Sequence, residues 1–425
     1  KIIAQAPQVQ NIFSKINQRT AVLSQPLEPF IEKIIPYLDE KYGSFKGAPK
    51  FPQFYMFDAI FYFYLKTNNQ KYFTPVEKLL SNISSKGIYD QLAGGISRYS
   101  VDEKWIIPHF EKMLYDNIQY IDLLTKFYQK TEKEYFKKKL IQTIKFINQE
   151  FKNDENLYGS AYDADSEGVE GKYYVWSFEE LKKLLENDFV LFEKKYEISS
   201  SGNFEGKNIL VESKNKLNEE EQNKIAEIEN KLFLERKKRI KPFFDDKSQT
   251  DLNAYILDTL LNASIVLEDN NLKNETITTF KILNDKLSNK IYHCYNSNEI
   301  DVFLEDYVYY AKLLVTLYEV DEDKQALEKS ITILKEIWEI FYNKDTQLLQ
   351  KNRIKQNDLF VSPIDLNDNN IPNGNSVYLN LCNKIYTITN DKFWFYKVEI
   401  LKKSFHQILN SFYSQMFSFI KNLDL

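Results

Sequence analysis

The sequence predicts an all-α fold in which six helical hairpins form a ring, an (α/α)6 toroid with small β-hairpins in its long loops. Three observations predict it: helical periodicity dominates the chain of 425 residues, short and long connections alternate, and all 11 glycines lie in the long connections. Alternate connections of an up-and-down helical array lie at the same end. We therefore expect the long loops to gather at one end, where binding and catalysis usually occur.

Apolar side chains that recur every three or four residues, such as Phe110, Leu114 and Ile118, predict eleven scaffold helices. Their expected ranges are 27–41, 53–67, 72–85, 109–130, 132–151, 250–267, 270–289, 300–319, 323–343, 375–390 and 393–420. A further charged helix over 219–238 is expected to be a solvated excursion.

The number of scaffold helices predicts an incomplete ring, because six hairpins need one helix more. We expect either a further loop and helix beyond Leu425, or the segment 8–22 in the gap, or an open ring. Residues 23–425 are thus predicted to form one toroid, cut before its last helix.

The composition excludes several classes of protein. Lys and Arg total 56 against 61 Asp and Glu, and this net charge of −5 excludes a strongly basic nucleic-acid-binding protein. Two cysteines, Cys294 and Cys382, exclude a disulfide framework and a zinc–cysteine site. No apolar run is long enough for a transmembrane helix. We expect a cytoplasmic protein with no metal, no cofactor and no nucleic-acid or membrane partner.

A glycine-rich loop that runs into a helix at Pro108 holds the first candidate site residues. On that helix His109, Lys112 and Asp116 would share one face, close to Arg98 of the loop. This polar stripe on an otherwise apolar helix predicts a site. The alternative is a helix cap, a surface pair of Lys112 with Asp116 and a partly buried His109.

An acidic loop holds the second group. On an extended segment, Asp163 and Asp165 project to the same face. Paired carboxylates suit acid/base chemistry on a glycosidic bond, because a close pair raises one pKa, and they also suit Ca²⁺. The EF-hand pattern fails, since its acidic twelfth position is Tyr174, and the alternative is a plain acidic turn. Short strands are expected over 97–101, 157–162 and 173–176.

Four further side chains give weaker signals. Lys50 lies between two prolines and could contact a phosphate or carboxylate. Asp306 stands at a helix start, where the helix dipole favours acids in any case, and Asn375 could act only as a helix cap. Trp176 and loop tyrosines could form a stacking platform for sugar rings, although chance placement is a serious alternative with 29 tyrosines.

Several motifs together resemble one protein family. The matching stretches are 47–52 (GAPKFP), 87–92 (GIYDQL), 98–102 (RYSVD), 108–117 (PHFEKMLYDN), 163–168 (DADSEG), 202–208 (GNFEGKN) and 374–376 (GNS). They resemble the spermatogenesis-associated thioredoxin-like proteins, which include the bacterial YyaL type. The sequence departs from the family pattern at 43–47, 252–254 and 372–376.

The resemblance implies an N-terminal thioredoxin-like domain followed by a six-hairpin, glycosidase-like toroid. Such toroids are similar to those of sugar 2-epimerases and glycoside hydrolases. Residues 1–22 would then be the tail of the thioredoxin-like domain or a linker, and that domain would be a partner of the toroid.

The sequence therefore predicts a carbohydrate-acting protein with a pocket at the loop end, which takes a small-molecule or oligosaccharide substrate. The catalytic candidates are Asp116, Asp163, Asp165 and His109, and Asp116 should line one pocket with Asp163 or Asp165 at about 5–10 Å. The predicted substrate-binding residues are Lys50, Tyr89, Asp90, Arg98, Tyr99, Glu111, Lys112, Tyr115, Asn117, Glu167, Trp176, Asp306 and Asn375.

Three kinds of function stay open. Glycoside hydrolase-like acid/base chemistry is favoured over a sugar 2-epimerase-like isomerase, because such epimerases use two histidines. Only His109, His293 and His406 occur here, and only the first lies in a strong motif. The third possibility is a non-catalytic binding or scaffold module that serves a thioredoxin-like domain.

Overall fold

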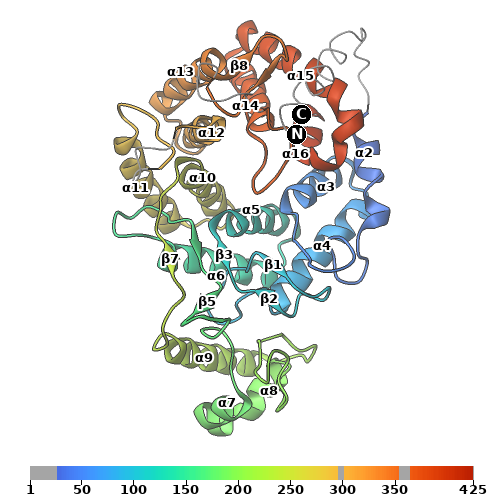
Figure 1. Ribbon diagram of the computed structural model, residues 1–425, viewed down its shortest axis with the longest axis vertical. Helices are drawn as coiled ribbons and strands as arrows, with labels where there is room; N and C mark the ends of the chain where they lie inside the picture. The colour runs from blue at the N-terminus through green and yellow to red at the C-terminus, as the bar shows by residue number, and fades with distance from the viewer. Residues whose placement is uncertain (1–25, 295–300, 354–363, 425) are drawn as a thin grey trace, which may run out of the picture. The chain divides into compact units, whose positions relative to one another are not determined.

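The structure, a computed structural model, describes residues 26–294, 301–353 and 364–424 (Figure 1). The segment 8–22, expected to fill a gap in the ring, lies outside the described residues. The chain divides into two compact units. Unit 1 comprises Lys1–Pro36, Asp58–Asn68 and Lys247–Leu425, and unit 2 comprises Tyr37–Phe57 and Asn69–Asp246.

Unit 1 contains three consecutive helical hairpins. They are α10 (Thr250–Val266) with α11 (Asn270–Lys286), α12 (Leu304–Asp321) with α13 (Lys324–Phe341), and α14 (Gly374–Thr389) with α15 (Lys392–Phe412). The first helices of successive hairpins pack on one another, α10 on α12 and α12 on α14. These three helices therefore run in the same direction, and their N-terminal ends gather with the long loops at one end of the unit, as predicted.

The last helix of unit 1 corrects the prediction of one continuous helix over 393–420. After α15 comes a 3-10 turn, η3 (Tyr413–Gln415), and then a separate helix, α16 (Phe417–Asp424). The buried carboxylate of Asp368 causes the break, because it accepts the backbone N–H of Ser418 at 2.7 Å and so starts a new helix there.

α16 joins the end of the described chain to a helix near its start. It packs on α14 and forms side-chain contacts with the part of α3 (Phe54–Thr67) that belongs to unit 1. Lys421 Nζ lies 2.6 Å from Asp58 Oδ2, and the Tyr62 hydroxyl lies 3.0 Å from Asp424 Oδ2.

The short turns between paired helices share one backbone conformation and contain no glycine. In each, a residue of positive φ follows the first helix and the N-cap of the second helix comes next. The positive-φ residues are Asn68, Glu132, Glu268, Glu322 and Asn390, with φ of 53° or 54°. Left-handed backbone costs a non-glycine residue about 1–2 kcal/mol. At four of the five turns an Asn or Asp N-cap helps to offset it by accepting a backbone N–H.

Unit 2 contains α4 (Gln70–Ser85), the hairpin of α5 (Leu114–Thr131) with α6 (Glu134–Glu150), and three excursion helices, α7 (Phe178–Leu185), α8 (Phe189–Lys195) and α9 (Glu219–Arg236). The predicted β-hairpins in the long loops are present. β1 (Tyr99–Ser100) pairs with β2 (Pro108–His109), β4 (Ala161–Tyr162) lies between β3 (Lys112–Met113) and β7 (Phe244–Asp245), and β5 (Asp165–Ser166) pairs with β6 (Val169–Glu170). Shorter elements of the chain are α2 (Glu28–Glu32), η1 (Ile35–Tyr37), η2 (Glu186–Asp188), and β8 (Tyr342–Asn343) paired with β9 (Leu348–Leu349).

The helix predicted to open at Pro108 begins only at α5. His109 is paired with Tyr99 in the β1–β2 ladder, and Lys112 lies in β3. Backbone pairing with neighbouring strands overrides the helical spacing here. His109, Lys112 and Asp116 therefore do not share a helix face, and that prediction was wrong.

Other predicted boundaries also need correction. The strand expected over 173–176 is a single bridge from Trp176 to Asn208. The helix expected over 27–41 is limited to α2 and η1, and the side-chain cap of α14 is Asn373 rather than Asn375.

α9 is a helix, as predicted over 219–238, but it is not a solvated excursion. It buries Ile225, Ile228 and Leu232 in a core that also contains Trp176 and Phe192. The prediction failed because three apolar side chains on one face suffice to dock a charged helix.

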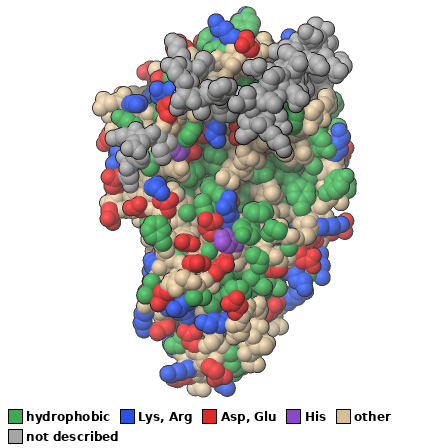
Figure 2. Space-filling model, viewed as in Figure 1, with side chains coloured by type: hydrophobic (Ala, Val, Ile, Leu, Met, Phe, Trp, Pro, Cys, Tyr) green, Lys and Arg blue, Asp and Glu red, His purple; other side chains and the backbone are tan. Residues whose placement is uncertain are grey.

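The surface agrees with the small net charge. On the face seen in Figure 2, acidic and basic side chains are interspersed. None of the described helices is long and apolar enough to cross a membrane.

Candidate functional site

Asp90, Lys112 and Arg236 form a buried network in unit 2, here called the Asp90 network. The two carboxylate oxygens of Asp90 each accept a hydrogen bond from Arg236 at 2.9 Å, and Lys112 Nζ lies 2.8 Å from Oδ2. Burial alone would raise the pKa of Asp90, but the two cations outweigh it and hold the pKa below its usual value. The surface pair of Lys112 with Asp116, considered from the sequence, does not form, because Lys112 is buried against Asp90.

A small cavity adjoins the Asp90 network and is lined in part by Tyr89, Phe110 and Tyr174. Its volume of about 30 Å³ matches one water molecule and is too small for a sugar ring. The Nε of Arg236 has no hydrogen-bond partner among the described residues, so a water there would satisfy it. These contacts indicate a structural role for Asp90 and Lys112, although both were predicted to bind substrate.

Two more predicted binding residues in unit 2 are buried and hydrogen-bonded. The Tyr89 hydroxyl donates to Gln142 at 2.9 Å. The Asn117 side chain brackets the backbone of Ile96, accepting its N–H at 2.8 Å and donating to its C=O at 3.1 Å. Both side chains join α5 or α6 to the preceding loop.

Lys50, Trp176 and Asn375 are buried as well. Lys50 is 2% exposed and pairs with Asp39 at 2.5 Å, and Trp176 is fully buried in the α7–α9 core. In unit 1, Asn375 accepts from the backbone N–H of Leu349 at 2.8 Å and donates to its C=O at 2.9 Å. Contacts within the fold account for Lys50 and Asn375, whereas the buried Nε1 of Trp176 has no hydrogen-bond partner among the described residues. The binding role of all three stays a prediction.

Asp163 and Asp165 project from one side of an extended segment, as the sequence predicts. They and Glu167 are exposed, while the residues between them are buried. Glu167 pairs with Lys172 at 2.8 Å. The charged groups that act on the pKa of Asp116 are Arg98 and Glu111, not these aspartates. A pocket shared by Asp116 with Asp163 or Asp165 therefore stays a prediction.

Arg98, Glu111, Tyr115 and Asp116 form a half-buried group in unit 2, here called the Asp116 cluster. Glu111 holds Arg98 twice, through the side chains at 3.3 Å and through a backbone hydrogen bond at 3.0 Å. The guanidinium lies over the Tyr115 ring at 5.9 Å. Asp116, in the first turn of α5, has a buried Oδ2 with no hydrogen-bond partner among the described residues.

The environment of Asp116 favours the protonated form of its carboxyl. Burial raises its pKa well above the usual value, Glu111 raises it further, and Arg98 only partly opposes them. A carboxyl with a raised pKa and a free oxygen is a typical general acid.

His109 borders the Asp116 cluster at the surface. Its Nδ1 lies 2.8 Å from Glu170 Oε1 and its Nε2 lies 3.9 Å from Glu111 Oε2. Its ring stacks on Tyr99, with 4.9 Å between the centroids and 21° between the planes. His109 thus lies between two carboxylates and against one aromatic face, with 30% of its side chain exposed.

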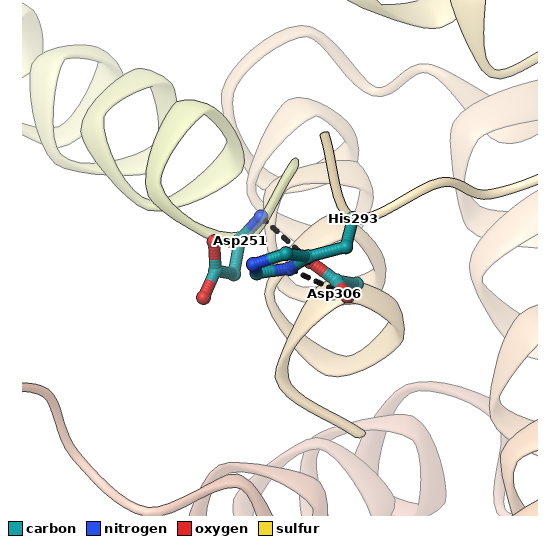
Figure 3. Close-up of side chains that lie close together, drawn as sticks. All are labelled: Asp251, His293 and Asp306. Atoms are coloured by element: carbon teal, nitrogen blue, oxygen red, sulfur yellow. Dashed lines mark hydrogen bonds and ion pairs between the residues drawn. The ribbon is translucent and has the colours of Figure 1, made fainter. Parts of the chain in front are cut away.

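A second candidate group lies in unit 1, around His293 (Figure 3). Its Nδ1 lies 3.0 and 3.1 Å from the two carboxylate oxygens of Asp306, and its Nε2 lies 3.1 Å from Gln249 Nε2. Asp306 also accepts the backbone N–H groups of Phe303 at 2.8 Å and Asp251 at 3.3 Å. His293 and Asp306 therefore clamp the starts of α10 and α12 together.

Two carboxyls beside this clamp have raised pKa values. Burial raises the pKa of Glu305 to about 7, with Lys351 opposing and Asp251 adding to the shift. Burial also raises the pKa of Asp251, and the charge of Asp306 adds to that shift. Glu305 Oε2 is buried without a hydrogen-bond partner among the described residues.

Asp251, His293 and Asp306 each offer one potential metal-ligand atom, and these atoms lie within 4.8 Å of one another. However, both ring nitrogens of His293 already have partners, in Asp306 and Gln249. We interpret the group as a hydrogen-bonded clamp and assign no ion to it.

Sequence reasoning missed Asp251, Glu305 and His293. A usable signal was present, because Asp116, Asp251 and Glu305 each stand in the first turn of the first helix of a hairpin. For residues 304–307 the acidic helix start was attributed to the helix dipole, which favours acids at this position in any case.

The arrangement of helical hairpins with long loops at one end defines the class of protein, and solved structures agree. A cellobiose 2-epimerase from Bacillus thermoamylovorans covers 93% of this chain and 86% of its own, with a TM-score of 0.53 and 15% identity. A family 105 glycoside hydrolase from Clostridium acetobutylicum covers 91% and 83%, with a TM-score of 0.51 and 13% identity. A family 76 α-mannanase from Bacteroides thetaiotaomicron covers 91% and 83%, with a TM-score of 0.51 and 10% identity. The chain therefore has the (α/α)6 six-hairpin fold, which these carbohydrate-acting enzymes share.

The relatives by sequence include spermatogenesis-associated proteins, which confirms the resemblance seen in the motifs. Spermatogenesis-associated protein 20 of Mus musculus is 26% identical over 424 residues, with 87% of this chain and 54% of the relative covered. Its Homo sapiens counterpart is 26% identical over 348 residues, with 69% and 44% covered. The chain spans about half the length of these relatives. No family model matches the chain.

Proposed function

We propose that this protein hydrolyses a glycosidic bond in an oligosaccharide or a smaller glycoside, with Asp116 as the proton donor. The observation that carries the proposal is the state of its carboxyl, which has a buried oxygen without a partner among the described residues and a raised pKa. Such a carboxyl favours its protonated form and can give the proton to a leaving oxygen. The shared fold motivates the substrate class by analogy.

Glu111 is the second carboxyl of the proposal. Glycoside hydrolysis needs one carboxyl that gives a proton and another that acts on water or on the sugar. Glu111 suits the second role because Arg98 orients it and 28% of its side chain is exposed. Asp163 and Asp165 stay the predicted alternatives for this role.

The isomerase alternative finds less support in the histidines. Epimerase-like chemistry would need two imidazoles free to take and give a proton. Both ring nitrogens of His293 are engaged by Asp306 and Gln249, and His109 is paired with Glu170. Acid/base chemistry by carboxyl groups therefore remains the proposal.

The test is the variant D116N, with D122N as its matched control. Asp122 lies on the same helix, and its carboxylate pairs with Lys126 at 2.6 Å near the surface. Turnover is measured by the release of reducing ends from a panel of oligosaccharides and aryl glycosides. We expect D116N to lose about 10²–10⁴-fold in kcat while keeping its Tm, and D122N to keep both.

Wild-type turnover by D116N would contradict the role of Asp116. A wild-type protein that neither binds nor cleaves any glycan, and in which D116N changes only the Tm, would favour the scaffold alternative, in which the chain serves a thioredoxin-like domain.

A further inference from the structure

Unit 1 contains a pair of carboxyls that are not among the site residues predicted from the sequence. Asp251 is the second residue of α10, and Glu305 is the second residue of α12. Because α10 and α12 pack together and run in the same direction, their first turns lie at the same end of the unit. The charge of Asp251 acts on the carboxyl of Glu305, so the two groups are electrostatically coupled.

The carboxyl of Glu305 has an oxygen that is unpaired among the described residues, whereas Asp251 Oδ1 accepts the backbone N–H of Leu252 at 2.8 Å and the third acid beside them is fully engaged. Asp306 is fully buried, and its oxygens accept from His293, Phe303 and the backbone of Asp251. Glu305 instead has a buried Oε2 that no described residue contacts by a hydrogen bond. A buried polar atom without a partner costs free energy, which a native protein usually keeps only where the atom has a ligand or a function.

The surrounding residues hold this pair in place. His293 and Asp306 tie the start of α10 to the start of α12, as Figure 3 shows. On the other side, Gly374 begins α14, and a Cβ atom there would lie only 2.9 Å from Glu305 Oε1. The glycine therefore lets the Glu305 carboxyl lie directly against α14. Positions fixed in this way are what an acid/base pair requires.

We propose that Asp251 and Glu305 form an acid/base pair that hydrolyses a glycosidic bond, with Glu305 as the proton donor and Asp251 as the base. The substrate class rests on the proposed function given above. Glu305 gives its proton to the glycosidic oxygen while the bond from that oxygen to the anomeric carbon breaks. Asp251 takes a proton from the water whose oxygen bonds to the same carbon. The proton then returns from Asp251 to Glu305 through solvent.

The experiment uses E305Q and D251N with two kinds of substrate. An oligosaccharide needs a protonated leaving group, whereas a 2,4-dinitrophenyl glycoside leaves without a proton. On an oligosaccharide whose turnover D116N retains, we expect E305Q to lose about 10²–10⁴-fold in kcat and to keep its turnover of the dinitrophenyl glycoside. In D251N, added azide should replace the activated water as the nucleophile. Turnover should then be restored, with a glycosyl azide as the product. The control is E319Q, whose exposed carboxylate near the other end of α12 pairs with Lys384 at 2.8 Å.

Wild-type oligosaccharide turnover by E305Q and D251N would overturn the inference. A different result would also overturn it: turnover that is lost together with a lower Tm, and that neither the activated glycoside nor azide restores. That pattern marks a structural role. D116N, measured in parallel, separates the proposals: if it alone loses turnover, the proposed role of Asp116 stands and this inference falls. A wild-type protein that cleaves no glycoside would contradict both.

Discussion

Asp90 and Asp116 belong to neighbouring family-like motifs, yet unit 2 gives their carboxyls opposite environments. Asp90 is held by Arg236 and Lys112, and its pKa is lowered. Asp116 lacks a partner for one oxygen among the described residues, and its pKa is raised. At the scale of the residue, the available counter-charge decides which acid stabilises the fold and which one can transfer a proton.

Replacing Asp90 should therefore destabilise the protein strongly. D90N leaves Arg236 and Lys112 buried at 3% and 2% exposure without a counter-charge, which costs about 3–5 kcal/mol. The free energy of unfolding in urea measures this cost. E77Q is the control, because its partly exposed pair with Lys133 contributes about 0–1 kcal/mol. Equal stability of the two variants would show that the Asp90 network is not a structural centre.

At the scale of the element, contacts from other segments set where helices begin. β2 and β3 occupy the residues expected to open α5, and Asp368 separates α15 from α16. Asp368 is fully buried, and that burial raises its pKa to about 6, although hydrogen bonds from Ser418 and Asn373 oppose the shift. The cap of α16 is therefore sensitive to pH.

Because Asp368 caps α16 from a buried position, replacing it should change how the stability of the protein depends on pH. A carboxyl whose folded pKa of about 6 exceeds its ordinary 3.8 binds its proton more tightly in the folded state. Its contribution to stability is therefore fully present below about pH 4 and is lost as the pH rises through 6. Between pH 4 and 7, wild type should lose about 2 kcal/mol more than D368N. Urea unfolding at both pH values measures this difference, and D365N in the same loop is the control. If D368N lost as much stability as wild type between pH 4 and 7, the assignment of this pH dependence to Asp368 would be contradicted.

At the scale of the whole molecule, the sequence predicted the properties that depend on local spacing. Helical periodicity gave the hairpins, and the positions of the glycines gave the long loops. The sequence could not predict that Arg236 would contact Asp90, because these residues lie 146 positions apart in the chain. The pair of Asp251 and Glu305 was missed for the same reason, since only the packing of α10 on α12 brings their first turns together. Asp116 could be singled out because it lies within one continuous motif.

The contact between α16 and α3 joins residues 363 positions apart in the chain, and it provides the last prediction. Phe417, Phe419, Ile420 and Leu423 are at most 5% exposed, and burying each such side chain contributes about 1.5–3 kcal/mol. Their sum is comparable to the whole stability of a typical domain, about 5–15 kcal/mol. A chain that ends at Met416 should therefore lose the hydrogen-exchange protection of α14 and of residues 58–67 in α3. K421A, which removes only a partly exposed ion pair with Asp58, should keep it. Full protection in the shortened chain would mean that α16 is not needed to hold α3 in unit 1.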